Sequence, residues 1–500
     1  SSAASDVYKR QEQTFAYGYL AGSSLPSSLA MPNGIVRELA YEEHRDLAVA
    51  ISCRLGGTAL VSRSQSYDAL GRPVTRTQQR GTEATRTDSF SYNGRNELTG
   101  ATLGTAPYGY SYDNIGNRKT ARELAEELSY AANNLNQYTS IEEKAEAPFV
   151  PTYDASGNQT LIKTSTGIWT VVYNAANRAV SFTSQGGSTV VECGYDYQGR
   201  RYMKKVTVNG TVVSHERYLY RGYLQLAALD MLDNRNVLRT LLWDPLEPVA
   251  TRPLALVQEN ALYCYGVDFN KNVTEVFAGE GAIAATYDYS PYGQVVSTGD
   301  LVQPVQWSSE MNDVELALVY YNYRYYNPAD GRWINRDPIT EEGGWNLYEF
   351  MGNICVYKCD YLGLKDWTCD KKHLGWYDKL SFTLTNTIGG EEYAVSDPQS
   401  VIIGTFKEKL QDAAKSILEQ EIDGRQIIEA ARKAVNDNWF MRSLSGIVQN
   451  TRTNAYILEE TKLSVKLEYC CCEIDNKGKI KYFMNPVSGV DSFNLIFSLK

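Results

Sequence analysis

The phrase YDALGR, which begins at Tyr67, recurs in six variant copies that follow one another at near-regular steps. These copies are YNGRNEL (Tyr92), YDNIGNR (Tyr112), YAANNLNQ (Tyr130), YDASGNQ (Tyr153), YNAANRA (Tyr173) and YDYQGR (Tyr195). Counted from Tyr67, the tyrosines are 25, 20, 18, 23, 20 and 22 residues apart. A period of about 20 to 25 residues means that one supersecondary unit is repeated. The spacing therefore predicts a repeat architecture.

Each repeat has the letters of a strand, a turn and a second strand. Stretches such as Thr170-Val171-Val172-Tyr173 surround the turns and are typical of strands. Asp and Asn bond to their own backbone in turns, and the Gly that often follows accepts a positive φ. A unit this short cannot bury its apolar face alone, so the units must add side by side. We expect one continuous antiparallel sheet that curls around a cavity.

The overall composition supports a β-rich protein. The chain of 500 residues contains 37 tyrosines but 13 phenylalanines, and tyrosine suits strands because its ring packs while its hydroxyl stays bonded. The net charge is −10 and the basic residues are not clustered, which argues against nucleic acid as a partner of the repeats. No stretch is as long and as apolar as a membrane-spanning helix.

Histidine and cysteine are arranged in a way that disfavours metal chemistry. The three histidines, His44, His215 and His373, lie far apart, and the nine cysteines follow no regular spacing. Zinc sites need these residue types in clusters. The chain also lacks a glycine-rich phosphate loop. We therefore expect neither a metal nor a cofactor.

Two further stretches carry distinctive motifs. The first is Tyr265–Gln294, and the second is Tyr320–Leu364, which contains RYYNPADGRW, RDP and GGWNLY. Together with the repeats, they resemble the Rhs or YD-repeat family of polymorphic-toxin type over residues of about 12 to 364. The resemblance implies a mainly β fold, a cocoon-like shell of spirally wound β-sheet. It assigns 12–294 to the shell and 295–364 to the Rhs repeat-associated core domain that closes one end.

The first eleven residues, SSAASDVYKRQ, resemble the in-frame translation of a sequencing adapter. Such scars are excluded from fold reasoning. We expect residues 1–11 to be an artefact of this kind. A source in a metagenomic assembly and a missing true N-terminus follow from that expectation.

The composition changes at about Lys365, where the tyrosine phrases stop. A possible capping box at Thr405–Glu408 precedes an amphipathic stripe over 406–417, and a second stripe covers 427–435. Alternating apolar residues over 463–469 predict a strand, with a second near 480–484. Residues 365–500 are thus predicted to form a separable α+β domain. No known toxin is recognisable in it, although the family resemblance makes it the variable effector.

The candidate chemistry depends on two aspartates, Asp337 in RDP and Asp360 in DYLGL. In toxin-carrying members of the family, two aspartates in DPxG-like contexts are linked with self-cleavage after a terminal Gly-Leu. The resemblance maps that site to Asp337 and Asp360, with Arg336 beside the first, and the scissile bond to Leu364–Lys365. Two close carboxylates cannot both ionise, so one acts as acid while the other activates water.

This sequence departs from the family pattern at both turns. The second motif reads DYLGL instead of DPxGL, and Asn353-Ile354-Cys355 stands where Asn-Pro is usual. Proline would have preset φ in each turn. The alternative is that both aspartates are simply turn formers.

Two functional classes remain open. The first is a secreted or cell-surface shell that encloses and delivers a C-terminal effector against bacteria or hosts. Its implied partners are an immunity protein and components of a secretion system. The second is a cell-surface repeat protein for adhesion or carbohydrate binding, with a non-toxic tail.

Overall fold

The computed structural model describes residues 14–23, 25–144, 146–244, 251–360 and 362–364, and the backbone of four strands between 374 and 498. The chain divides into two compact units, Ser1–Trp367 and Thr368–Lys500, which are described separately. The prediction of a mainly β fold is confirmed, because almost every described element is a strand. The exceptions are four short 3-10 helices: η1 (Gly279–Gly281), η2 (Trp307–Ser309), η3 (Thr340–Gly343) and η4 (Met351–Asn353).

The first sheet contains twelve strands that pair in chain order. All neighbours are antiparallel, as expected for strands joined by short turns. The strands are β1 (Ala16–Tyr19), β2 (Pro26–Ala30), β3 (Ile35–Tyr41), β4 (Ala48–Leu55), β5 (Thr58–Tyr67), β6 (Pro73–Arg80), β7 (Arg86–Tyr92), β8 (Leu98–Leu103), β9 (Ala106–Tyr112), β10 (Arg118–Glu123), β11 (Glu126–Ala132) and β12 (Tyr138–Glu143).

The second sheet contains fourteen strands, also antiparallel and in chain order. Its last strand ends at Thr298. The strands are β13 (Thr152–Tyr153), β14 (Gln159–Thr164), β15 (Gly167–Tyr173), β16 (Ala179–Ser184), β17 (Thr189–Tyr195), β18 (Arg201–Val208), β19 (Thr211–Arg221), β20 (Leu224–Asp230), β21 (Val237–Trp243), β22 (Pro253–Gln258), β23 (Ala261–Val267), β24 (Val273–Phe277), β25 (Ile283–Tyr289) and β26 (Val295–Thr298).

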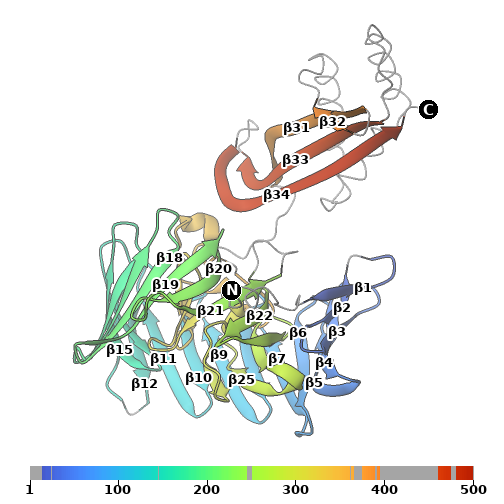
Figure 1. Cartoon of the computed structure of the whole chain (residues 1–500). Helices are drawn as coiled ribbons and strands as arrows, with labels where there is room; N and C mark the ends of the chain where they lie inside the picture. Colours follow the sequence, from blue (N-terminus) through green and yellow to red (C-terminus); the bar gives the residue numbers. More distant parts are fainter. Residues whose placement is uncertain are drawn as a thin grey trace. The chain divides into compact units, whose positions relative to one another are not determined.

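The prediction of one continuous sheet is wrong, because the ladder breaks between β12 and β13. The connecting segment contains Pro148 and Pro151, which lack the N–H group that a ladder needs. A single bridge, between Ile141 and Phe149, remains there. Figure 1 shows the strands winding from blue through cyan and green, until the yellow-green strands β22 and β25 return beside the blue ones.

The turns of the repeats are fixed by the side chain that begins them. In each repeat an Asp or Asn Oδ1 accepts the backbone N–H groups two and four residues later, at 2.8–3.0 Å. The residue three positions later has a positive φ, for example 77° at Gly71 and 69° at Asn96. The seven turn-starting residues are Asp68, Asn93, Asp113, Asn133, Asp154, Asn174 and Asp196.

The tyrosines of the repeats connect neighbouring units. Their hydroxyl groups donate to backbone carbonyls of an earlier strand at 2.6–2.9 Å, as seen for Tyr67, Tyr92, Tyr112, Tyr173 and Tyr195. The fourth copy differs from the prediction, because its turn begins at Asn133 and Ala132 takes the tyrosine position. Tyr130 instead lies buried within β11. The register predicted for this copy is therefore wrong by two residues.

A third, four-stranded sheet lies between the two large ones. It consists of β27 (Met311–Asp313), β28 (Leu318–Tyr320), β29 (Tyr325–Asn327) and β30 (Arg332–Trp333). Because side chains alternate along a strand, neighbouring residues enter different clusters. Tyr320 and Tyr325 pack with the second sheet, whereas Val319, Tyr321 and Tyr326 pack with the first. The four short strands are thus buried between both sheets.

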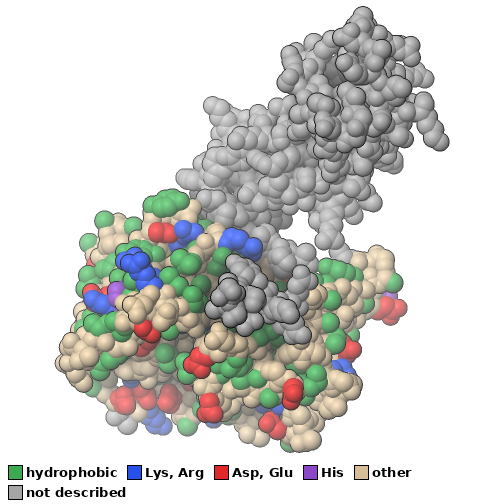
Figure 2. Space-filling model, in the orientation of Figure 1, with side chains coloured by type: hydrophobic (Ala, Val, Ile, Leu, Met, Phe, Trp, Pro, Cys, Tyr) green, Lys and Arg blue, Asp and Glu red, His purple; other side chains and the backbone are tan. Residues whose placement is uncertain are grey.

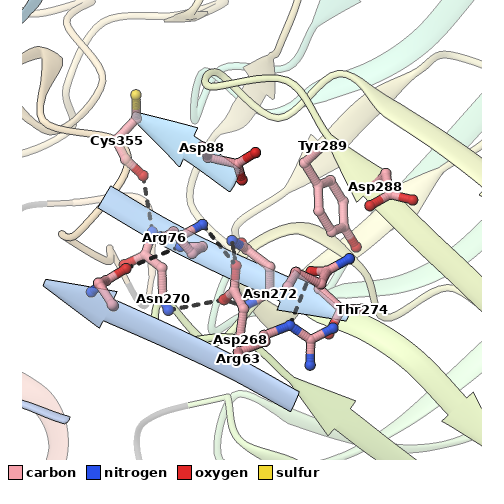
Figure 3. A network of polar contacts seen from close by, with 12 residues as sticks. Arg63, Arg76, Asp88, Asp268, Asn270, Asn272, Thr274, Asp288, Tyr289 and Cys355 are labelled. Atoms are coloured by element: carbon pink, nitrogen blue, oxygen red, sulfur yellow. Dashed lines mark hydrogen bonds and ion pairs between the residues drawn. The ribbon is translucent and has the colours of Figure 1, made fainter. Parts of the chain in front are cut away.

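The first and second sheets also meet through a network of buried charges. Arg63 on β5 and Arg80 on β6 both pair with Glu275 on β24, which is completely buried. Arg80 also pairs with Asp288 on β25 at 2.8 Å. Figure 3 shows Arg63 and Asp288 of this network, where strands of the two sheets face each other.

The turn that begins at Asp268 connects the first sheet with the chain around Cys355. Asp268 accepts the backbone N–H groups of Asn270 and Asn272 at 2.9 Å and lies 3.6 Å from Arg76. The Asn270 side chain donates to the carbonyl of Cys355 at 2.9 Å, as drawn in Figure 3. Three distant parts of the chain are therefore joined within a few residues.

The second unit has its own antiparallel sheet in the order β32-β31-β33-β34. Its strands are β31 (Leu374–Ile388), β32 (Glu391–Ala394), β33 (Glu460–Ile474) and β34 (Ile480–Ser498). The strands predicted at 463–469 and 480–484 fall within β33 and β34. The helices predicted over 406–417 and 427–435 lie outside the described residues.

The surface of the first unit mixes all types of side chain. On the face shown in Figure 2, acidic and basic groups are interspersed among hydrophobic and uncharged ones. Within the part of the chain that the structure describes, no helix is long and apolar enough to cross a membrane.

We predict that Glu275→Gln lowers the free energy of unfolding by about 3–5 kcal/mol, because it leaves the buried Arg63 without its carboxylate and removes one of the two carboxylates that pair with Arg80. Glu146→Gln is the control, since Glu146 is 57% exposed where it pairs with Lys163. Its loss should cost less than about 1 kcal/mol. Chemical denaturation of both variants measures the difference. Equal effects would mean that the buried network does not hold the sheets together.

Candidate functional site

The first candidate residue, Asp337, is buried in the segment between β30 and η3. Its backbone N–H donates to the carbonyl of Leu347 at 2.9 Å. One carboxylate oxygen, Oδ1, accepts the backbone N–H of Ile339 at 3.0 Å. The backbone of Gly343 lies so close that a β-carbon there would come within 2.5 Å of the other oxygen, Oδ2. These contacts hold the carboxylate in one orientation.

The second candidate, Asp360, is 2% exposed and shapes the loop that follows it. Its Oδ1 atom accepts three backbone N–H groups, from Leu362 at 3.0 Å, Gly363 at 2.7 Å and Leu364 at 3.4 Å. The turn predicted for this motif therefore exists, and the aspartate side chain forms it. A carboxylate that accepts several N–H groups is held firmly without a proline.

Arg324, which immediately precedes β29, joins the two aspartates. Its Nη1 lies 3.0 Å from Asp337 Oδ2, and its Nη2 lies 3.7 Å from Asp360 Oδ2. The guanidinium stacks on the ring of Trp333, at 4.1 Å from the ring centroid. Both aspartates thus face one buried cation, and the structure brings together residues that are 23 positions apart.

Arg336, predicted beside the first aspartate, lines a surface pocket together with Asp337. Its side chain is exposed, and its aliphatic part packs against Gly157, where a β-carbon would come within 2.5 Å of Arg336 Cδ. Sequence reasoning missed Arg324 because it lies within a tyrosine-rich strand segment. A signal was present, since a charged residue among residues that read as buried is rarely tolerated without a partner.

Burial controls the titration of the two aspartates. It raises the pKa of Asp337 to about 6, an effect that Asp360 increases and Arg324 opposes. Burial also raises the pKa of Asp360, against the opposing influence of Arg324 and of the three backbone N–H groups. One protonated and one ionised carboxyl group near neutral pH are what acid–base catalysis by a carboxylate pair requires.

The chain after Asp360 is clamped against the same arginine. Arg324 Nε donates to the Gly363 carbonyl, and Nη2 donates to the Leu364 carbonyl at 3.2 Å. The backbone N–H of Tyr323 donates to the Leu362 carbonyl at 2.9 Å. Gly363 has a φ of 74°, and a β-carbon there would come within 3.0 Å of Tyr321 atoms. Lys365, on the other side of the candidate bond, lies outside the described residues.

Within the described residues, no group of three or more His, Cys, Asp or Glu side chains could hold a metal ion.

A family model described as the Teneurin YD-shell matches residues 9–356. The chain belongs to the Teneurin YD-shell family. The predicted resemblance to YD-repeat proteins is thereby confirmed, and the tyrosine phrases are the repeats of this shell. The crystal structure titled TcdB2-TccC3-TEV shares the fold, with a TM-score of 0.58 and 18% identity. That similarity covers 70% of this chain and 19% of the other.

Two curated relatives are named as a nuclease and a toxin subunit. The tRNA nuclease WapA of Bacillus subtilis is 25% identical over 282 residues, which is 54% of this chain and 11% of WapA. Toxin subunit YenC2 of Yersinia entomophaga is 23% identical over 164 residues, which is 31% of this chain and 16% of YenC2. The match to this YD-shell therefore spans only a small part of each relative.

We predict that the effect of Asp337→Asn on stability depends on pH. Because the folded pKa of about 6 lies above the usual 3.8, wild-type stability falls as pH rises from 3.8 to 6. Asparagine cannot lose a proton, so the melting temperature of the variant minus that of wild type should become more positive from about pH 4 to about pH 7. The exposed Asp300→Asn is the control. A difference that does not change with pH for Asp337→Asn would contradict the raised pKa.

Proposed function

We propose that this YD-shell is a self-cleaving carrier that releases a C-terminal effector, secreted or held at the cell surface. The observation that carries the proposal is Arg324, which contacts Asp337, Asp360 and the carbonyl of Leu364 at once. An aspartate pair beside a positioned carbonyl is an arrangement suited to hydrolysis of the Leu364–Lys365 bond.

In the proposed reaction, water attacks the Leu364 carbonyl carbon. The ionised aspartate accepts one proton from that water, and the protonated aspartate gives its proton to the Lys365 nitrogen as the peptide bond breaks. Arg324 Nη2, already 3.2 Å from the Leu364 oxygen, stabilises the negative charge that develops there. The products are a carboxylate at Leu364 and an amine at Lys365, and no other reactant is needed.

The loss of proline in both motifs is compatible with this reaction. Asp360 fixes the DYLGL loop through its three backbone N–H contacts. In the turn Asn353-Ile354-Cys355, Asn353 has a φ of 57°, and its side-chain amide donates to the carbonyl of Gly116 at 2.9 Å. Side-chain hydrogen bonds thus supply the rigidity that proline gives elsewhere in the family.

The proposed domain limits are 12–294 for the shell, 295–364 for the core domain and 365–500 for the effector. The boundary between the two compact units, after Trp367, supports the last limit. The names of WapA and YenC2 support an effector role, for which an immunity protein and a secretion system are the proposed partners.

We predict that the full chain, synthesised in a cell-free system, splits into residues 1–364 and 365–500. Asp337→Asn and Asp360→Asn should each stay intact, because each removes one of the two protonation states. Arg324→Gln should slow cleavage by about 100-fold or more, whereas Arg336→Gln should change it by less than about threefold, since Arg336 does not contact the reacting groups. Gel analysis and terminal sequencing measure these outcomes.

An intact wild-type chain after prolonged incubation would contradict self-cleavage and return both aspartates to the role of turn formers. Growth arrest by the tail, relieved by a small neighbouring gene product, would support the effector. A harmless tail would favour the adhesion or carbohydrate-binding alternative.

A further inference from the structure

A pocket of about 380 Å³ leads from the surface of the first unit to Asp337. Its mouth is lined by exposed residues of two repeat turns and of the 336–340 segment, among them Ser156, Ala176 and Pro338. Its inner wall is formed by the buried residues Asn158 and Asp337 together with Asn335. The pocket thus connects solvent with a carboxylate that is only 7% exposed.

The walls of this pocket are held by bonds of the surrounding chain. Asn158 Nδ2 donates to Asn177 Oδ1 at 2.9 Å, which links the two turns. Arg178 donates to the Asn322 carbonyl at 2.9 Å and stacks on the ring of Tyr323, 4.5 Å from its centroid. These contacts fix the positions of the two turns and of Arg178 in the wall of the pocket.

The lining is polar and adjoins the loop that carries the candidate bond. Nine of the eleven lining residues have polar side chains: Ser156, Asn158, Asn177, Arg178, Tyr323, Asn335, Arg336, Asp337 and Thr340. Water occupies pockets of this size when several polar partners are available. Tyr323 lines the pocket and also holds the Leu362 carbonyl through its backbone N–H at 2.9 Å.

We propose that this pocket is the entrance through which the attacking water reaches Asp337, an inference that rests on the proposed self-cleavage. The two repeat turns, 154–158 and 174–178, then have a second role, because their residues form part of the wall of this entrance. Asp337 is the carboxylate that receives the water. Asp360 does not line this pocket, and its Oδ1 is occupied by three backbone N–H groups.

The test is to close the entrance from the outside. Ala176→Trp and Ser156→Trp place an indole at the mouth, at exposed turn positions that line the pocket. Ala175→Trp and Ala155→Trp are the matched controls, at exposed neighbouring positions of the same turns that do not line it. In the full chain, synthesised cell-free, we expect the first pair to cleave at least about tenfold more slowly than the control pair.

A second measurement does not depend on cleavage. A water-soluble carbodiimide with an amine should label Asp337 in the Asp360→Asn chain, which is expected to stay intact, as measured by peptide mass spectrometry. In that chain, Ala176→Trp should protect Asp337 whereas Ala175→Trp should not. Cleavage of all four variants at the wild-type rate, equal slowing of all four, or no labelling of Asp337 would each overturn the entrance. An uncleaved wild-type chain, with Asp337 labelled and protected as expected in the Asp360→Asn chain, would instead overturn the proposed self-cleavage alone.

Discussion

The constraint on which the first unit depends is the burial of two large sheets against one small one. Each large sheet has an apolar inner face that it cannot cover alone. The small sheet covers both, because alternate side chains of β28 and β29 enter different clusters: Tyr320 and Tyr325 on one side, Val319 and Tyr326 on the other. Arg324 of the candidate site immediately precedes β29, so this residue is attached to the buried centre of the first unit.

Placing that segment inside the shell has an electrostatic cost, which the structure offsets in clusters. Glu275 is buried between two arginines, and Asp313 lies between Arg201 and Lys204 in the same way. Removing one partner of such a pair leaves an uncompensated charge, which is strongly unfavourable. These clusters connect strands far apart in sequence and so specify how the sheets meet.

The candidate site differs from the structural clusters in its balance of charge. One guanidinium, Arg324, faces two carboxylates, so burial is only partly offset and the pKa of Asp337 rises to about 6. In the structural pair with Arg201 and Lys204, by contrast, two cations lower the pKa of Asp313 to about 2. An excess of carboxylates over cations keeps a proton available, which a structural ion pair does not need.

The repeat unit and the mainly β fold follow from the amino-acid sequence alone, because strand periodicity and Asp/Asn turns are local properties. The two aspartates were predicted from the resemblance to the YD-repeat family. Asp68 fixes its turn through residues at most four positions away. Two outcomes emerge only in the folded chain: β28 and β29 pack against both large sheets, and Arg324 is the cation between the aspartates. Those outcomes depend on which distant strands share a core, and no short-range pattern encodes that choice.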